Sequence, residues 1–112
     1  MGAGRTPAEP LPVEGLIDTG SGRSLVATEV VRRLGVRPLR AVEIDTPSST
    51  DVKVHEYPVR FWFDREFSVE VVALDAPLPV FGLGALVGRD VLDRGQLVYD
   101  GPAGEFVLTL GA

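Results

Sequence analysis

Residues 15–21 read Gly-Leu-Ile-Asp-Thr-Gly-Ser, and residues 85–92 read Ala-Leu-Val-Gly-Arg-Asp-Val-Leu. In both stretches a short apolar run, typical of a β-strand, leads directly into a turn that contains glycine and a charged residue. A carboxylate placed after a strand in this way can lie at the mouth of a cleft, and Gly20 and Gly22 allow close approach of a backbone or a ligand. Taken alone, Asp-Thr-Gly more often marks an ordinary turn or a helix N-cap, because three-residue motifs recur by chance.

The composition limits the kinds of site that the chain can hold. The 112 residues contain no cysteine, which excludes disulfides, thiolate metal ligands and cysteine nucleophiles. A single histidine offers little material for an imidazole metal site. We therefore expect no metal and no cofactor. The length and the hydrophobic fraction of 45% fit one soluble globular domain.

Charge and hydropathy limit the partners and the compartment. The net charge of -5 argues against nucleic acid, whose phosphates select a basic surface. No apolar run approaches the roughly 18 residues of a membrane span, and the first residues lack the apolar core of a signal peptide. A cytoplasmic protein without a membrane partner is therefore expected. The basic residues are almost all arginine, which indicates a GC-rich bacterial genome.

The chain divides into a lead-in and one domain. Residues 1–12 are rich in proline and glycine and predict a flexible lead-in, whereas residues 13–112 carry the strand patterns. A short helix is expected within residues 24–34, ended by Gly35 as a left-handed cap. The expected strands cover residues 13–18, 42–45, 52–63, 67–74, 85–87, 96–99 and 105–110, with a loop at 75–84 and a helical turn at 89–93. Many short strands with little helix predict an all-β domain.

The two motifs, in this order and about seventy residues apart, resemble those of the retropepsin-like aspartic proteases. This family is built around a single Asp-Thr-Gly in each chain, and the similarity extends over about residues 13–110. The resemblance implies a small closed β-barrel with a flap hairpin and one short helix, as one lobe per chain.

The same resemblance implies how the protein would act. Family members hydrolyse peptides with two carboxylates that share one proton and hold a water molecule between them. This chain has one Asp-Thr-Gly, since Asp45-Thr46 is followed by Pro47. An active enzyme must therefore be a homodimer in which each subunit contributes Asp18, and its substrate is an extended peptide.

Further roles follow from motif position. The Thr19 hydroxyl is expected to bond across the two-fold axis, Gly20 to offer its carbonyl to the substrate, and Ser21 to line the next subsite. Arg89 corresponds to a structural anchor of the loop.

Leu16 and Leu86 match positions that form the walls of the central pockets, although simple core packing explains either leucine equally well. The flap tip falls near residues 46–51. There Ser48, Ser49 and Thr50 can donate backbone N–H groups to a peptide, although an ordinary exposed turn fits the same residues.

A second interpretation is a retropepsin fold that binds peptides or dimerises without hydrolysis. Three differences from the family favour it: the flap tip has no glycine, Gly22 replaces an acid that pairs with the arginine in viral members, and the region before the first strand is short and proline-rich. A fragment of a larger protein, with residues 1–12 as a linker, is a third interpretation.

Other features of the sequence carry weaker signals. Gly82-Leu83-Gly84 is followed by no βαβ unit and is interpreted as a loop rather than a dinucleotide site. His55 lies in a predicted strand, far from any nucleophile motif, and is expected to be an exposed strand residue. The aromatic residues of 61–67 are expected in the core or on a sheet face.

Overall fold

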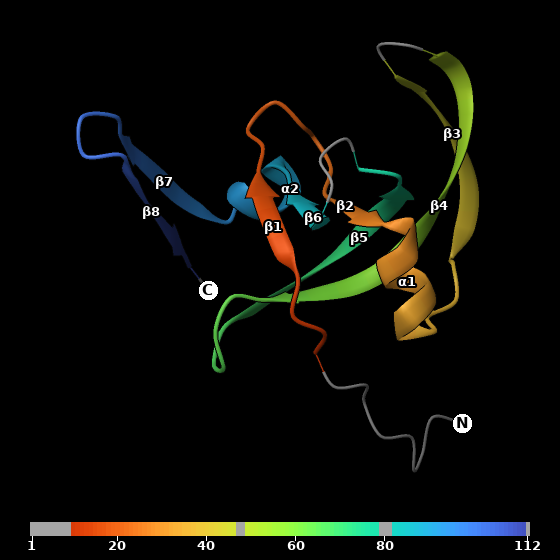
Figure 1. Cartoon of the computed structure of the whole chain (residues 1–112), viewed down its shortest axis with the longest axis horizontal. Coiled ribbons are helices and arrows are strands. Elements are labelled where there is room, and N and C mark those ends of the chain that lie inside the picture. Colours follow the sequence, from red (N-terminus) through yellow and green to blue (C-terminus); the bar gives the residue numbers. More distant parts are fainter. Residues whose placement is uncertain (1–9, 47–48, 79–81, 112) are drawn as a thin grey trace.

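The computed structural model describes residues 10–46, 49–78 and 82–111, and this part of the chain is mostly β-strand (Figure 1). The all-β class expected from the sequence is thus confirmed. In chain order the elements are β1 (Glu14–Ile17), β2 (Leu25–Ala27), α1 (Thr28–Leu34), β3 (Arg40–Thr46), β4 (Ser49–Trp62), β5 (Ser68–Ala76), β6 (Leu83–Val87), α2 (Arg89–Leu92), β7 (Gly95–Asp100) and β8 (Glu105–Leu110).

Among the described residues, six strands form one mixed sheet in the order β1-β6-β2-β5-β4-β3. β1 runs parallel to β6, and β2 runs antiparallel to β6 and parallel to β5. β4 is antiparallel to both β5 and β3. The strands β1 and β6 that precede the two sequence motifs are therefore direct neighbours, and their ends bring the motifs together.

The closed barrel expected from the family resemblance is not formed by the described residues. β1 and β3 are the two edges of the sheet and do not pair with each other. Closure requires that the end strands meet with a matching tilt and stagger. Here β1 is only four residues long, and β3 leaves the sheet together with β4 as a projecting hairpin, at the right of Figure 1.

The core lies between the sheet and the two helices. Along β5 the side chains alternate, with Val69, Val71 and Ala73 buried, as expected of a strand with one inner face. Val31 of α1 and Val91 of α2 complete this cluster. Phe61 and Phe67 pack partly buried against it, whereas Trp62 and Phe63 are exposed.

The end of α1 confirms one prediction and its beginning corrects another. Gly35 has φ of 68° and donates its N–H to the carbonyls of Val31 and Arg32, which is the expected left-handed cap. The helix, however, begins at Thr28, because Leu25–Ala27 pairs with both β5 and β6 as β2. Strand and helix together produced the mixed apolar spacing that the sequence showed.

The ends of most other strands differ from expectation by one to three residues. β5 continues to Ala76 and β6 begins at Leu83, so the expected loop 75–84 is shorter. Residues 1–9 of the expected lead-in lie outside the described residues. Among the described helices none has the length and apolar character needed to cross a membrane.

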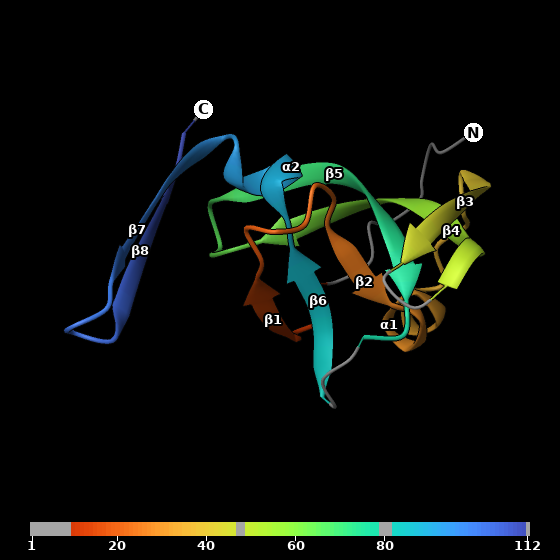
Figure 2. The ribbon, with the colours of Figure 1, turned by 90° about the horizontal axis from the view of Figure 1, so that it is seen from above.

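β7 and β8 form a separate hairpin that projects to the left of the sheet in Figures 1 and 2. Val98 is paired with Val107, and Tyr99 with Phe106. Because paired residues share a face and neighbours alternate, one apolar pair lies on each face of the hairpin. All four side chains are more than half exposed, at 51–75%.

Candidate active site

Asp18 is the first residue after β1 and begins the loop of residues 18–24. Its N–H donates to the Val87 carbonyl at 2.9 Å, which extends the pairing of β1 with β6 by one residue. Its Oδ1 accepts the N–H of Gly20 at 2.9 Å, and its carbonyl accepts the N–H of Ser21 at 3.2 Å. These bonds fix the half-buried Asp18 carboxylate at the start of a tight turn.

The second motif holds this loop from the other side. The Arg89 N–H donates to the Ser21 carbonyl at 2.8 Å, and the Arg89 Nη1 donates to the Thr19 carbonyl at 2.9 Å. A Cβ built on Gly22 would lie 3.3 Å from Arg89 Nη2, so the guanidinium packs close over this glycine. Beside Gly22, the arginine side chain thus has a backbone carbonyl, that of Thr19, as its partner.

Ser24 and Asp90 form a buried link beneath the loop that sequence reasoning missed. Ser24 is fully buried, and its N–H and Oγ donate to the two carboxylate oxygens of Asp90 at 2.9 and 2.6 Å. The Ser24 Oγ also accepts the N–H of Gly88 at 3.0 Å. Asp90 belongs to the recognised motif, but the serine that precedes β2 carried no comparable signal in the sequence.

The remaining residues predicted for the loop and the pockets are placed as follows. Thr19 is exposed, and Ser21 is half-buried with its hydroxyl donating to the Arg23 carbonyl at 2.6 Å. Leu16 and Leu86 are paired in β1 and β6, but Leu16 is 45% exposed and Leu86 only 6%. In the single chain Leu16 is thus the leucine available to a ligand, whereas Leu86 packs inside.

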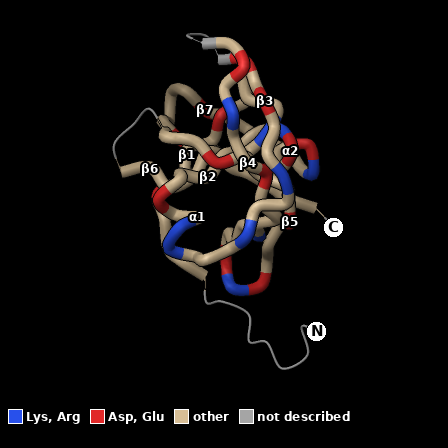
Figure 3. Tube along the Cα trace, turned by 90° about the vertical axis from the view of Figure 1, so that its right-hand side faces the viewer, with Lys and Arg blue, Asp and Glu red and all other residues tan. Residues whose placement is uncertain are grey.

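The predicted flap corresponds to the β3–β4 hairpin. Thr50 lies in β4 and is exposed, Ser49 is the first residue of that strand, and Ser48 lies outside the described residues. Asp51 has φ of +55° and donates its N–H to Asp45 Oδ1 at 3.1 Å, where the strand register shifts. Both basic and acidic residues occur along this hairpin, as the colouring of Figure 3 shows.

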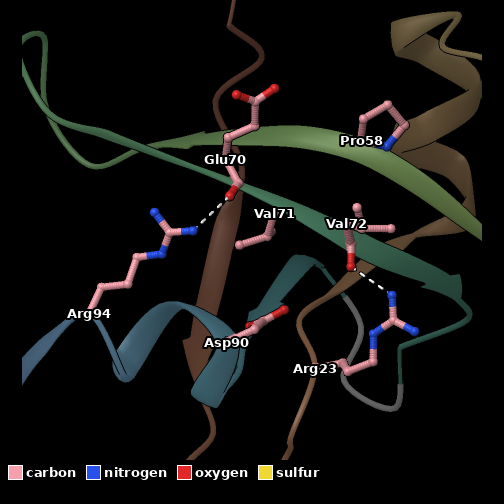
Figure 4. Close-up of a pocket in the computed structure, with 7 residues that line it drawn as sticks. All are labelled: Arg23, Pro58, Glu70, Val71, Val72, Asp90 and Arg94. Atoms are coloured by element: carbon pink, nitrogen blue, oxygen red, sulfur yellow. Dashed lines mark hydrogen bonds between the residues drawn. The ribbon is translucent and has the colours of Figure 1, made fainter.

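Asp18 lines neither of the two hollows described on the surface. One, of about 470 Å³, lies between β5 and α2 with Arg23 and Arg94 at its rim (Figure 4). The other, of about 390 Å³, lies beside α1 and includes His55, Tyr57 and Asp75. The His55 N–H donates to Asp75 Oδ1 at 2.8 Å, and burial, followed by the charge of Asp75, raises the pKa of the Tyr57 hydroxyl.

Residues 10–46, 49–78 and 82–111 contain no group of three His, Asp or Glu side chains placed to hold a metal ion. Compared with models of known protein families and with the sequences of curated proteins, the chain matches none.

Proposed function

We propose that this chain is a retropepsin-like aspartic endopeptidase that acts as a homodimer and cleaves extended peptides. The observation that supports it most is the joining of the two sequence motifs: the loop that begins at Asp18 is clamped by Arg89 and by the Ser24–Asp90 link. A half-exposed carboxylate on such a rigid loop is pre-organised, as a catalytic group must be.

The chemistry needs a second carboxylate beside the first. Two carboxylates a few ångströms apart cannot both ionise, so they share one proton, as is well known for aspartic proteases. The ionised Asp18 removes a proton from the water, and the protonated Asp18 of the second subunit donates to the peptide carbonyl oxygen. The water oxygen attacks the carbonyl carbon, and protonation of the leaving nitrogen completes the cleavage.

The β7–β8 hairpin supplies a surface for that second subunit. A lone two-stranded hairpin is only marginally stable in water, and this one has apolar side chains on both faces. We expect the hairpins of two chains to cover each other. The exposed Leu16 and the β3–β4 hairpin would then contact an apolar peptide across the two Asp18 carboxylates.

The test is cleavage of a mixed peptide library at about pH 4 to 7, read by mass spectrometry. Asp18→Asn keeps the shape of the side chain but removes its ability to exchange a proton, so we expect cleavage to fall by at least about a thousandfold. Asp93→Asn, at an exposed aspartate beyond α2, is the matched control and is expected to cleave normally. Full activity in Asp18→Asn would refute the proposal.

A second candidate is a peptide-binding or dimerisation module of the same fold without hydrolysis. It is favoured by the flap tip expected at residues 46–51, which has no glycine, and by the single Asp-Thr-Gly of the chain, which supplies only one of the two carboxylates that hydrolysis needs. Library peptides that bind wild type but are never cut would support this candidate.

A further inference from the structure

Glu56 is a carboxylate buried at the base of the β3–β4 hairpin. Its side chain is only 8% exposed, and burial of an unpaired carboxylate is strongly unfavourable. Two arginines from different parts of the fold satisfy it: Arg40 Nε on β3 donates to Oε1, and Arg23 Nη2 lies 2.8 Å from Oε2. Each oxygen of one carboxylate thus holds a different segment of the chain.

Glu56 is also the residue at which the pairing of β4 changes. It is the Cα partner of Arg40 on β3 and of Leu74 on β5. On its amino-terminal side β4 pairs with β3, and on its carboxy-terminal side β4 pairs with β5. Any bending of the hairpin relative to the sheet must therefore pass through this position.

Arg23 connects this position with the loop that carries Asp18. From the loop before β2 its side chain reaches across β5, where Nη2 also donates to the Val72 carbonyl at 2.8 Å (Figure 4). The Arg23 carbonyl in turn accepts the Ser21 hydroxyl at 2.6 Å. The chain of contacts runs from the catalytic loop to Glu56 and on to β3.

We infer that Glu56 is a positioning residue that couples the hairpin to the Asp18 loop, so that movement of the hairpin over a peptide and the seating of Asp18 change together. The consequence for catalysis rests on the proposed function, but the coupling does not. A matched pair serves as control: Arg60 and Glu70 bridge β4 and β5 at 3.0 Å, but both are exposed and neither reaches the loop.

Two backbone amides report on the Asp18 loop and on the β3–β4 hairpin, and neither measurement needs a substrate. The Gly20 N–H bonds to the Asp18 carboxylate, and the Asp51 N–H bonds to Asp45 in the hairpin. Hydrogen exchange at both is measured by NMR in wild type, Arg40→Gln, Arg23→Gln and Glu70→Gln. The side chains of Arg40 and Arg23 are 73% and 40% exposed, so their loss leaves the core intact.

Coupling predicts that a substitution at the hairpin changes exchange in the Asp18 loop, and the reverse. Arg40→Gln should speed exchange at Gly20 by about tenfold, although Arg40 does not touch the loop, and Arg23→Gln should do the same at Asp51. Glu70→Gln should change neither amide. If Arg40→Gln changes exchange only at Asp51, and Arg23→Gln only at Gly20, Glu56 forms two independent ion pairs and the inference is overturned.

Cleavage kinetics add a second readout. In Arg40→Gln we expect kcat for a library peptide to fall about tenfold in addition to a rise in KM, because loss of the coupling disturbs the seating of Asp18 as well as the hold of the hairpin on the peptide. An equal loss in Glu70→Gln would overturn the inference. If wild type cleaves nothing, the proposed function fails, while the exchange measurements still decide whether the coupling exists.

Discussion

Gly88 lies where two loops cross without room for a side chain. A Cβ at this position would lie 2.7 Å from the carbonyl group of Arg23 and 2.8 Å from the carbonyl oxygen of Ser21. Both obstacles are backbone atoms, so the loop that carries Asp18 would have to move. We expect Gly88→Ala to lower the free energy of unfolding by about 2 kcal/mol, measured by urea denaturation.

Gly15 offers the matched control for this substitution. Its Cβ would be 3.9 Å from the Ala85 carbonyl, an ordinary contact, so Gly15→Ala should cost much less. Equal losses in the two variants would show that the crossing of the loops is not tightly packed at Gly88.

Individual residues differ in how well the sequence reveals them. Asp18 and Arg89 stand in short motifs whose residue types are informative by themselves. Ser24 and Glu56 do not, because their roles depend on partners that the fold brings together: Ser24 bonds to Asp90, 66 residues away. A serine before an apolar run and a glutamate in a polar alternation look ordinary until their partners are known.

The sequence predicted a helix or strand correctly where the residues of that element and its flanking turn were enough to define it. β8 has the expected bounds of residues 105–110, because the alternation and the Gly-Pro turn before it define a hairpin locally. β2 was missed because three residues are too few to show a period, and its pairing with β5 and β6 is non-local. The closed barrel was wrong for a similar reason, since closure depends on how the edge strands end.

The apolar faces of the β7–β8 hairpin predict that this element forms the contact between two subunits. Phe106 is 55% exposed, so a charge there costs the single chain little, but it would be buried between two hairpins. We expect Phe106→Lys to weaken self-association about thirtyfold, measured by sedimentation equilibrium.

Trp62 provides the comparison for this experiment, because it is an aromatic residue of similar exposure, 48%, that lies in β4 of the six-stranded sheet and not in the β7–β8 hairpin. Trp62→Lys should leave the dissociation constant unchanged. If both lysines weaken association equally, or neither does, the hairpin is not the contact between subunits.

At the scale of the whole molecule, the proposed function requires three parts to act together: the Asp18 loop, the β3–β4 hairpin and the β7–β8 hairpin. The first two are joined within the chain by Glu56 and its arginines. The third is joined to the body next to α2, because β7 begins at Gly95 soon after that helix ends, and Leu108 and Leu110 of β8 pack partly buried against the core. A subunit that docks through β7–β8 therefore acts on the element that also carries the Arg89 clamp.

The ionisation of Glu56 makes the stability of the folded chain rise with pH over a limited range. The hydrogen bond from Arg40, followed by that from Arg23, lowers the pKa of Glu56 below its ordinary value of 4.5. Between the lowered and the ordinary value the unfolded chain binds more protons than the folded one, so stability rises with pH there. The contribution of Glu56 is complete above the ordinary value and is lost as the pH falls through the lowered one.

We therefore expect the difference in free energy of unfolding between wild type and Glu56→Gln to shrink as the pH falls from about 6 to about 3. Urea denaturation at several pH values measures it, and Glu70→Gln should follow wild type throughout, because its ion pair is exposed. A difference that stays constant would mean that the arginines do not stabilise the ionised carboxylate. A lowered pKa would instead keep the ion pairs of Glu56 with Arg40 and Arg23 intact in mildly acidic solution.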